Sequence, residues 1–378
     1  MSVNKLKQTV LAVVAVSLFL ASGTALADYA LNMTEGVTPT SHRVYDLHMV
    51  ILYIVTAIGV VVFSVMGWSI FYHRKSKGAV AHQFHHSTMT EIIWTTVPIL
   101  ILVGIAVPAT KTLILMEQTG DAEMTIKVTG YQWKWKYDYL DEGISFFSTI
   151  SQDSNDARQR GSGIDPNTIE NYLLEVDKPI VLPVETKIRI LTTAADVIHA
   201  WWVPALGWKR DAIPGFINDN WTYIEEPGVY RGQCAELCGK DHAYMPIVLN
   251  AVSKEEYAAW VEEQKAEQLE AAAGSDREWS MDELMEKGKT VYAANCAACH
   301  LAEGEGIEGL FPALNGGAIV NGPVSEHVNI VLNGKNMMPV FKAQLNDVDI
   351  AAAITYERNS WDNSTGDVVQ PSVVKVAR

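Results

Sequence analysis

Cysteines and basic residues are both scarce in this sequence. Four cysteines among 378 residues are too few for a disulfide-rich scaffold. Charged residues account for 19% and hydrophobic residues for 48%, a balance that excludes an intrinsically disordered chain. The 29 Lys and Arg residues are outnumbered by 44 Asp and Glu residues, which gives a formal net charge of −15. This acidic balance argues against a nucleic-acid partner and suits a basic protein partner.

The amino-terminal third contains the apolar segments expected of a membrane protein. Residues 1–27 combine two lysines, a short apolar run and an Ala-x-Ala sequence. They predict a cleaved signal peptide, with a further transmembrane helix as the alternative. Within residues 28–117, two long apolar stretches predict transmembrane helices over about 47–72 and 92–114. The short loop between them is basic and predicts a cytoplasmic position, so both mature ends would lie outside the cytoplasm.

The rest of the chain divides into three parts by composition. Residues 118–252 contain short β-branched or alternating segments between turn signals, which predict an all-β sandwich or small barrel. Within them the polar stretch 153–164 predicts a surface loop. Residues 253–279 are rich in charged helix formers and predict a helical linker with few core residues. Residues 280–378 form the last unit, with predicted helices at 281–295 and 346–360.

Several potential metal ligands crowd one short segment in the β region. Cys234, Cys238, His242 and Met245 fall within twelve residues, and His199 lies upstream in an Asp-x-x-His sequence. Thiolate, thioether and imidazole together favour copper. A disulfide between the two cysteines and a zinc site are the alternatives, and the thioether argues against zinc.

The other two cysteines belong to a second motif. The sequence Cys296-Ala-Ala-Cys299-His300 is the C-x-x-C-H attachment signature of a c-type heme. A thioredoxin-like redox pair is the alternative, but here the motif closes with histidine and follows a predicted helix. A second axial ligand is expected downstream, where Met337 and Met338 precede a proline.

The C-x-E-x-C-x-x-x-H-x-x-M pattern with its upstream D-x-x-H resembles the binuclear copper-A site of cytochrome c oxidase subunit II. The resemblance implies a cupredoxin-like Greek-key barrel in which two thiolates bridge two copper ions. It implies a complete ligand set consisting of Cys234 and Cys238 as the bridges, His199, His242, Met245 and the Glu236 carbonyl. The Glu236 carboxylate would also reach a magnesium ion at the boundary with subunit I.

Two further segments resemble the same family. In the aromatic stretch Gly130–Tyr139, Trp133 would be the residue where electrons enter copper-A. At the start of the second apolar stretch, Glu91 would open a proton pathway into subunit I, with a snorkelling interfacial carboxylate as the alternative.

The carboxy-terminal unit resembles an all-α class I cytochrome c. The resemblance favours Met338 over Met337 as the iron ligand opposite His300. It also implies that the Pro312 carbonyl accepts a hydrogen bond from the His300 ring. Gly288, Tyr292 and Tyr356 look like the residues that join the first and last helices of that family.

Taken together, the chain resembles subunit II of a heme–copper cytochrome c oxidase with a fused cytochrome c domain, held in a bacterial inner membrane. Electrons would pass from an external cytochrome c through heme c and copper-A to subunit I. Oxygen would be reduced there, with proton translocation, since this chain offers no oxygen site of its own. A nitrous or nitric oxide reductase subunit and a stand-alone membrane-anchored electron shuttle are the alternatives.

Overall fold

The computed structural model describes residues 32–80, 85–159 and 161–378. The predicted signal peptide 1–27 therefore lies outside the described residues. Residues Glu35–Arg378 form one unit, and the description below concerns this unit alone.

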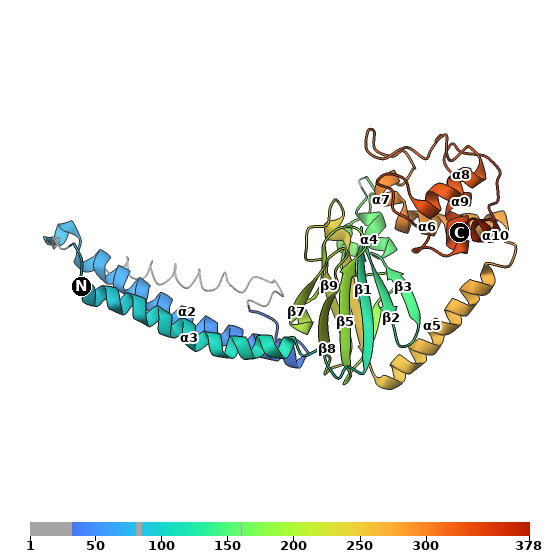
Figure 1. The fold of residues 1–378 in the computed structure, drawn as a ribbon. Helices are drawn as coiled ribbons and strands as arrows, with labels where there is room; N and C mark the ends of the chain where they lie inside the picture. The colour runs from blue at the N-terminus through green and yellow to red at the C-terminus, as the bar shows by residue number, and fades with distance from the viewer. Residues whose placement is uncertain (1–31, 81–84, 160) are drawn as a thin grey trace. The chain divides into compact units, whose positions relative to one another are not determined.

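Two long apolar helices come first, α2 (Pro39–Tyr72) and α3 (Thr88–Met116), separated by the short 3-10 turn η2 (Lys75–Lys77) (Figure 1). Both begin earlier than predicted. Thr38 forms a capping box with Ser41 and Pro39 occupies the first turn, which together set the start of α2. Their most apolar windows have mean hydropathies of 2.7 and 2.2 and are not buried. By length and composition both helices can cross a membrane.

Ten strands form the β domain that follows. They are β1 (Met124–Tyr131), β2 (Lys134–Tyr139), β3 (Ile144–Ser148), β4 (Ile180–Pro183), β5 (Lys187–Ala194), β6 (His199–Val203), β7 (Trp208–Ala212), β8 (Asn218–Tyr223), β9 (Gly228–Gln233) and β10 (Pro246–Val252). The sheet orders are β3-β2-β1-β5-β8, β4-β10-β9 and β6-β7. The β1–β5 and β4–β10 pairs are parallel and the others antiparallel. The predicted all-β, cupredoxin-like fold is confirmed.

The core of the β domain extends to the predicted copper ligands. Burial alternates strictly along β5, so one face of this strand packs inward. Trp135 and Trp201 are fully buried in the same cluster as Cys234, Cys238 and Met245. The ligand-bearing segment is therefore held by the packed interior rather than by a free loop.

The stretch predicted as a loop at 153–164 begins instead as a short helix, α4 (Gln152–Ala157), and the 3-10 turn η3 (Pro166–Thr168) follows it. Ser154, Asn155 and Ala157 of α4 are buried. The prediction was wrong because polar side chains here hydrogen-bond within the protein. Ser154 accepts from the Leu173 amide at 3.1 Å, and Asn155 from Arg158 at 2.8 Å.

The predicted linker is helical, as α5 (Lys254–Gly274), and has few core residues, since Val261 is its one buried residue. Ser253 and Glu256 form a capping box at its start. Its first turns pack on the barrel, because the Trp260 ring lies 5.0 Å from that of Tyr139 and Val261 is buried. The later turns are exposed, with Leu269 at 73%.

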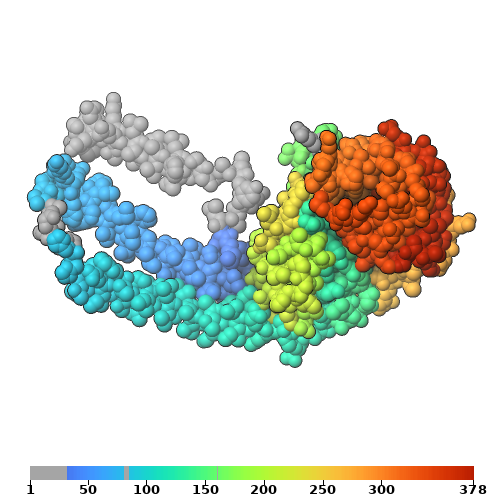
Figure 2. All heavy atoms as spheres, turned by 45° about the horizontal axis from the view of Figure 1, so that its top comes forward, coloured from blue at the N-terminus to red at the C-terminus, as the bar shows by residue number. Residues whose placement is uncertain are grey.

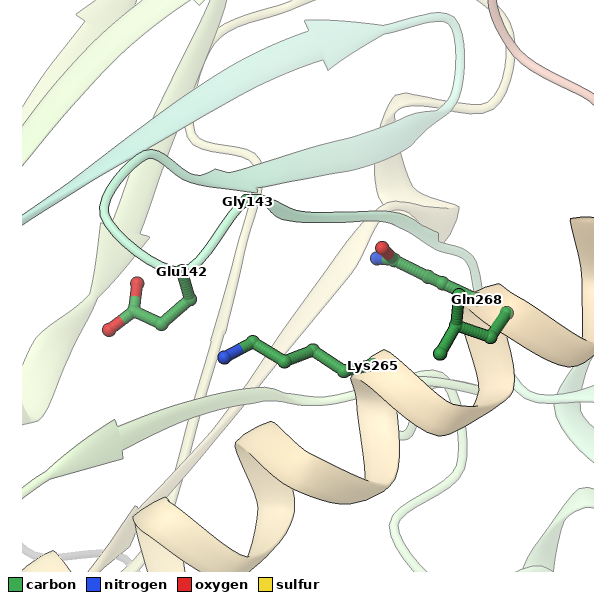
Figure 3. A pocket seen from close by; sticks show the side chains of 5 residues that line it. Glu142, Gly143, Lys265 and Gln268 are labelled. Atoms are coloured by element: carbon green, nitrogen blue, oxygen red, sulfur yellow. The ribbon is translucent and has the colours of Figure 1, made fainter.

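A shallow pocket of about 410 Å³ lies between the β2–β3 turn and the later turns of α5. Its lining residues are Glu142, Gly143, Lys265, Gln268 and Leu269. Figure 3 shows the Lys265 side chain extending toward Glu142. None of the predicted ligands lines this pocket, so it has no part in the metal chemistry.

The carboxy-terminal domain is all-α, as predicted. Its helices are α6 (Met281–Asn295), α7 (Ala297–His300), α8 (Val324–Asn333), α9 (Asp347–Asn359) and α10 (Pro371–Ala377). Helices α6 and α9 cross closely, because Gly288 leaves room for the Ala352 backbone and for Tyr356. Beside this crossing the rings of Tyr292 and Tyr356 lie 5.6 Å apart.

Candidate metal centres

Residues 234–245, here called the copper loop, connect two antiparallel strands. Gln233 in β9 pairs with Pro246 in β10. The Cys234 amide donates to the Met245 carbonyl at 3.0 Å. This ladder closes the loop at its base, while its tip is open, with 77% of Leu237 exposed.

The structure brings the predicted sulfur and nitrogen donors together. The Sγ atoms of Cys234 and Cys238 are 3.8 Å apart. His199 Nδ1 lies 3.8 Å from the first sulfur, and His242 Nδ1 lies 3.5 Å from the second. The Glu236 carbonyl oxygen is 3.3 Å from Cys234 Sγ. Each imidazole therefore faces its own thiol, which is the arrangement that two bridged metal ions need.

The fifth side-chain donor lies in the same core. Met245 is 1% exposed and belongs to the cluster that contains both sulfurs. Among the described residues, the nearest trio of potential ligand atoms comes from His199, Cys234 and Cys238, all within 4.8 Å of one another. Met245 is therefore buried in the same core as the two thiols.

The electrostatics of the two thiols differ. Hydrogen bonding from Cys238 lowers the pKa of Cys234 to about 3 against the opposing effect of burial, and His199 adds to the lowering. The neighbouring thiolate and burial raise the pKa of Cys238 well above its usual range. The pair thus holds one negative charge readily and resists a second. A cation must displace the remaining proton, as thiolate–metal binding does.

Asp196 and Gln132 contact the predicted copper ligands, and the sequence did not predict a role for either. Asp196 lies 3.0 Å from His199 Nε2 and accepts from the Gln132 amide at 2.7 Å. Burial lowers the pKa of His199, but the hydrogen bonds with Asp196 and Cys234 outweigh it and the net shift is upward. The Gln132 side chain donates to the Cys238 carbonyl at 2.8 Å. The Asp-x-x-His spacing was the available signal for Asp196.

Trp133 lies directly against the copper loop. Its ring nitrogen donates to the Cys238 carbonyl at 3.2 Å, and the ring packs beside Gly239. Gly130, three residues earlier, has His199 Cδ2 only 2.7 Å from where a Cβ would stand. Glycine there allows the imidazole to approach the strand.

Glu236 and Glu91, the two carboxylates predicted to have a function, lie far apart in the chain and have different surroundings. Glu236 points its carbonyl toward Cys234, while the residue itself is exposed at the loop tip. Glu91 is exposed in the first turn of α3 and accepts a hydrogen bond from the Ser87 amide at 3.3 Å. This contact gives Glu91 a local role at the helix start in addition to any role in proton transfer.

The heme motif occupies the junction of α6 and α7. Cys296 follows the last turn of α6, and Cys299 and His300 lie in α7. Burial raises the pKa of both Cys296 and Cys299. These cysteines are therefore held as neutral thiols, unlike the pair in the copper loop.

Two side chains, His300 and Met338, are expected to bind the iron. His300 is buried, and its Nδ1 lies 2.8 Å from the Pro312 carbonyl oxygen, which leaves Nε2 for a metal. Met338 packs against the domain core, whereas Met337 is 62% exposed. A cavity of about 480 Å³, lined by residues 305 and 307–313, opens beside Pro312. Figure 2 shows the surface of this domain hollowed in its orange part.

The residues present fit both cofactors. The β domain presents two sulfurs, two imidazoles and a thioether, a donor set that suits copper better than zinc. The helical domain presents two thiols, an imidazole oriented by the Pro312 carbonyl and a half-buried thioether. Fold and donors therefore define a membrane-anchored electron-transfer protein with a cupredoxin-like copper domain and a cytochrome c domain.

Comparisons with known proteins agree with this class. The periplasmic domain of cytochrome c oxidase subunit II matches residues 124–252, and the transmembrane domain of the same subunit matches residues 27–112. Subunit III of cbb3-type cytochrome c oxidase matches residues 283–356. All three parts of the chain are thus matched separately.

Individual relatives give the same result. A probable cytochrome c oxidase subunit 2 of Rickettsia prowazekii is 43% identical over 234 residues, which are 62% of this chain and 72% of the relative. Its counterpart in Rickettsia conorii is 42% identical over 59% of this chain and 68% of the relative. The solved periplasmic domain of subunit II of cytochrome oxidase from Bradyrhizobium japonicum is 43% identical, covering 40% of this chain and 99% of that chain, with a TM-score of 0.35.

The chain belongs to the cytochrome c oxidase subunit 2 family. Its relatives are subunits of an oxidoreductase complex, and the family implies copper-A in the β domain. The additional cytochrome c domain implies heme c. The chain is thus a membrane subunit with a periplasmic domain, as predicted.

Proposed function

We propose that this chain is the electron-receiving subunit of a heme–copper cytochrome c oxidase. It would take electrons from an external cytochrome c and deliver them to subunit I, where oxygen is reduced with proton translocation. The observation that carries the proposal is the complete donor set of the copper loop, gathered on the same chain as a heme motif with an oriented histidine. When bound, copper-A and heme c would each supply a one-electron relay.

The chain's own residues would hold these groups in the following way. Cys234 and Cys238 would bridge two copper ions, with His199, His242, Met245 and the Glu236 carbonyl completing the set. Asp196 orients His199 through its second ring nitrogen. In the heme domain, Cys296 and Cys299 would carry the heme and His300 and Met338 would bind its iron, with Pro312 orienting His300.

The exposed tip of the copper loop supports a contact with subunit I. Glu236 and Leu237 are both exposed there and are free to contact a neighbouring subunit. We propose that the Glu236 carboxylate holds a magnesium ion at this contact. Glu91 would serve a proton pathway entrance at the cytoplasmic end of α3.

The membrane placement and the donor follow from charge. The basic segment after α2 supports a cytoplasmic position for that end of the helix pair, so the copper and heme domains would lie on the outer side of a bacterial inner membrane. The net charge of −15 would attract a basic cytochrome c to the heme domain. The proposed domain division is 28–117, 118–252, 253–279 and 280–378.

Metal and heme content of the full chain tests the proposal. The chain would be produced with heme maturation, loaded with copper and analysed for copper and covalent heme per polypeptide. Two coppers and one heme are expected. One heme without copper would show that the cysteine pair is not a ligand set, and the route for electrons would fail.

Oxygen consumption by the co-purified complex separates the oxidase from the alternatives. A nitrous or nitric oxide reductase would retain the cofactors but would not reduce oxygen. A stand-alone shuttle would purify without subunit I.

A further inference from the structure

Three hydrogen bonds join the copper domain to the heme motif. Lys134 Nζ in β2 donates to Asn295 Oδ1 at 2.7 Å. Asn155 Nδ2 in α4 donates to the Ala293 carbonyl at 3.2 Å, and Lys240 Nζ in the copper loop donates to the Ala298 carbonyl at 2.8 Å. The donors come from three separate segments of the β domain, but their acceptors all lie within residues 293–298.

Lys134 is the most buried of these donors. It is 5% exposed, and its ammonium lies over the rings of Phe147 in the copper domain and Phe341 in the heme domain, at 4.8 and 5.5 Å. Burial lowers its pKa to about 8. Its neighbour Trp133 contacts the copper loop. Lys134 therefore lies between the two domains, next to Trp133, the residue proposed to receive electrons.

The acceptors suit donors of this kind. Residues 293–295 form the last turn of α6, where backbone carbonyls have no partner within the helix and the helix dipole is negative. The Asn295 side chain donates to the Val291 carbonyl at 2.9 Å, which turns its oxygen toward Lys134. Asn155 thus satisfies a backbone carbonyl at the end of α6, whereas Lys134 bonds the Asn295 side chain and Lys240 bonds the Ala298 carbonyl of α7.

The copper side of the contact is itself braced. Arg158 donates to Asn155 Oδ1 at 2.8 Å, which leaves the amide nitrogen free to reach Ala293. Arg158 also pairs with buried Asp241 of the copper loop at 3.3 Å. The same arginine therefore couples α4 to the loop that carries Lys240.

We propose that Lys134, Asn155 and Lys240 form a docking surface for the segment Ala293–Ala298, so that the chain's own heme domain occupies the electron-receiving face of its copper domain. This inference rests on the proposed function. The surface would hold the heme attachment site beside Trp133 and the copper loop. One electron would leave the reduced heme and enter the oxidised copper pair, with no bond made or broken. External cytochrome c would therefore deliver to the heme domain and not directly to Trp133.

Lysine acetylation of the full-length, heme-loaded chain tests the docking surface, and it needs neither copper nor activity. An N-hydroxysuccinimide acetate reagent and mass spectrometry would compare Lys134 with Lys136 on the same strand, whose side chain is 24% exposed. Lys134 is expected to react about tenfold more slowly than Lys136. Equal rates in the unsubstituted chain would overturn the proposal.

Two matched variants locate the cause of the protection. Ala293→Arg places a large cation against Asn155, whereas Ala294→Arg changes the neighbouring exposed residue of the same helix. Ala293→Arg should raise Lys134 labelling to the level of Lys136 and leave the heme spectrum unchanged, and Ala294→Arg should alter neither. Continued protection in a heme-loaded Ala293→Arg chain would show that the copper domain alone buries Lys134, which overturns the docking surface.

A rate measurement separates this proposal from the proposed function. In the copper-loaded chain, Ala293→Arg should slow heme-to-copper electron transfer about tenfold or more, because the two domains lose their fixed orientation. Protection of Lys134 in a chain whose heme never reduces copper would uphold the docking surface and overturn the function.

Discussion

The copper site and the heme site differ in how far the protein arranges the ligands before the cofactor binds. In the copper domain, the two thiols and two imidazoles are already within 3.8 Å of one another in pairs, and one thiol is held as a thiolate. In the heme domain, burial raises the pKa of both thiols, and Pro312, which holds the His300 ring, lines a cavity of about 480 Å³. A packed barrel can preorganise a metal site, whereas a small helical domain leaves part of its core to the cofactor.

The hydrophobic cores show the same contrast. Cys234, Cys238 and Met245 belong to the main cluster of the barrel, together with Trp135 and Trp201. The cluster of the heme domain is built on α8, α9 and α10, and Met338 joins it only from the edge. Losing the cofactor should therefore cost the heme domain more than it costs the barrel.

The largest expected effect tests this contrast directly. The double variant Cys296→Ser with Cys299→Ser should speed amide hydrogen exchange in α6 and α9 about a hundredfold or more, because the hollow stays unfilled. The double variant Cys234→Ser with Cys238→Ser should leave exchange in β1 and β5 within about threefold. Exchange mass spectrometry of the full chain measures both. If exchange in β1 and β5 rises as much as exchange in α6 and α9, the proposed difference between the two domains is wrong.

The next prediction concerns independence of the two centres. Cys234→Ser should abolish the binuclear copper spectrum, because the two copper ions would lose one of their bridging thiolates. The absorption of heme c should stay intact. Cys238→Ser is the matched variant and should behave in the same way. Loss of the heme spectrum in either variant would contradict the separation of the two centres.

The iron ligand can be assigned by a neighbouring pair of variants. Met338→Ala should eliminate the methionine-to-iron charge-transfer band, because the half-buried thioether is the one that packs toward the core. Met337→Ala should preserve the band, since Met337 is 62% exposed. The opposite pattern would transfer the assignment to Met337.

A smaller effect is expected for the residue that orients the copper imidazole. Asp196→Asn should weaken copper affinity about 10- to 100-fold, because His199 loses the anionic partner at its second nitrogen. Asp219→Asn is the control, since Asp219 pairs with Arg189 away from the copper loop. Copper titration followed by optical absorption measures both. Equal weakening in the two variants would point to a general loss of stability.

The smallest effect is a pH dependence of the contact between the two domains. Burial lowers the pKa of Lys134 to about 8 from its ordinary value of 10.5, although Cys296, Asp177 and Asp196 act in the opposite direction. Between these values the separated state binds more protons than the docked state, so docking strengthens as the pH rises. Small-angle scattering of the full chain should show this tightening, and Lys134→Met should flatten it. Weaker docking at higher pH would contradict the sign.

Much of this protein could be predicted because its chemistry lies in local motifs. The copper loop spans twelve residues and the heme motif five, so their donors are close in space for covalent reasons alone. The apolar helices were equally visible, since a membrane span needs only a long uncharged run. The predicted helix at 281–295 has the same bounds as α6.

The loop prediction at 153–164 was wrong because polar composition describes an isolated segment. In the folded protein Asn155 accepts a hydrogen bond from Arg158 and donates one to Ala293. The helical linker was predicted correctly, but its contact between Trp260 and the ring of Tyr139 was not. Tertiary contacts of this kind override local preference, and nothing in the spacing of these residues indicates them.

Residue types alone establish which atoms can bind copper and heme and that the chain can enter a membrane, because ligand chemistry and hydrophobic length depend on residue type. Folding was needed to bring His199 to Cys234, Asp196 to His199 and Lys134 to Asn295. These pairs are 35, 3 and 161 residues apart in the chain. The two long separations close only when the strands and helices pack. The short one depends on the turn before β6, which the same packing fixes.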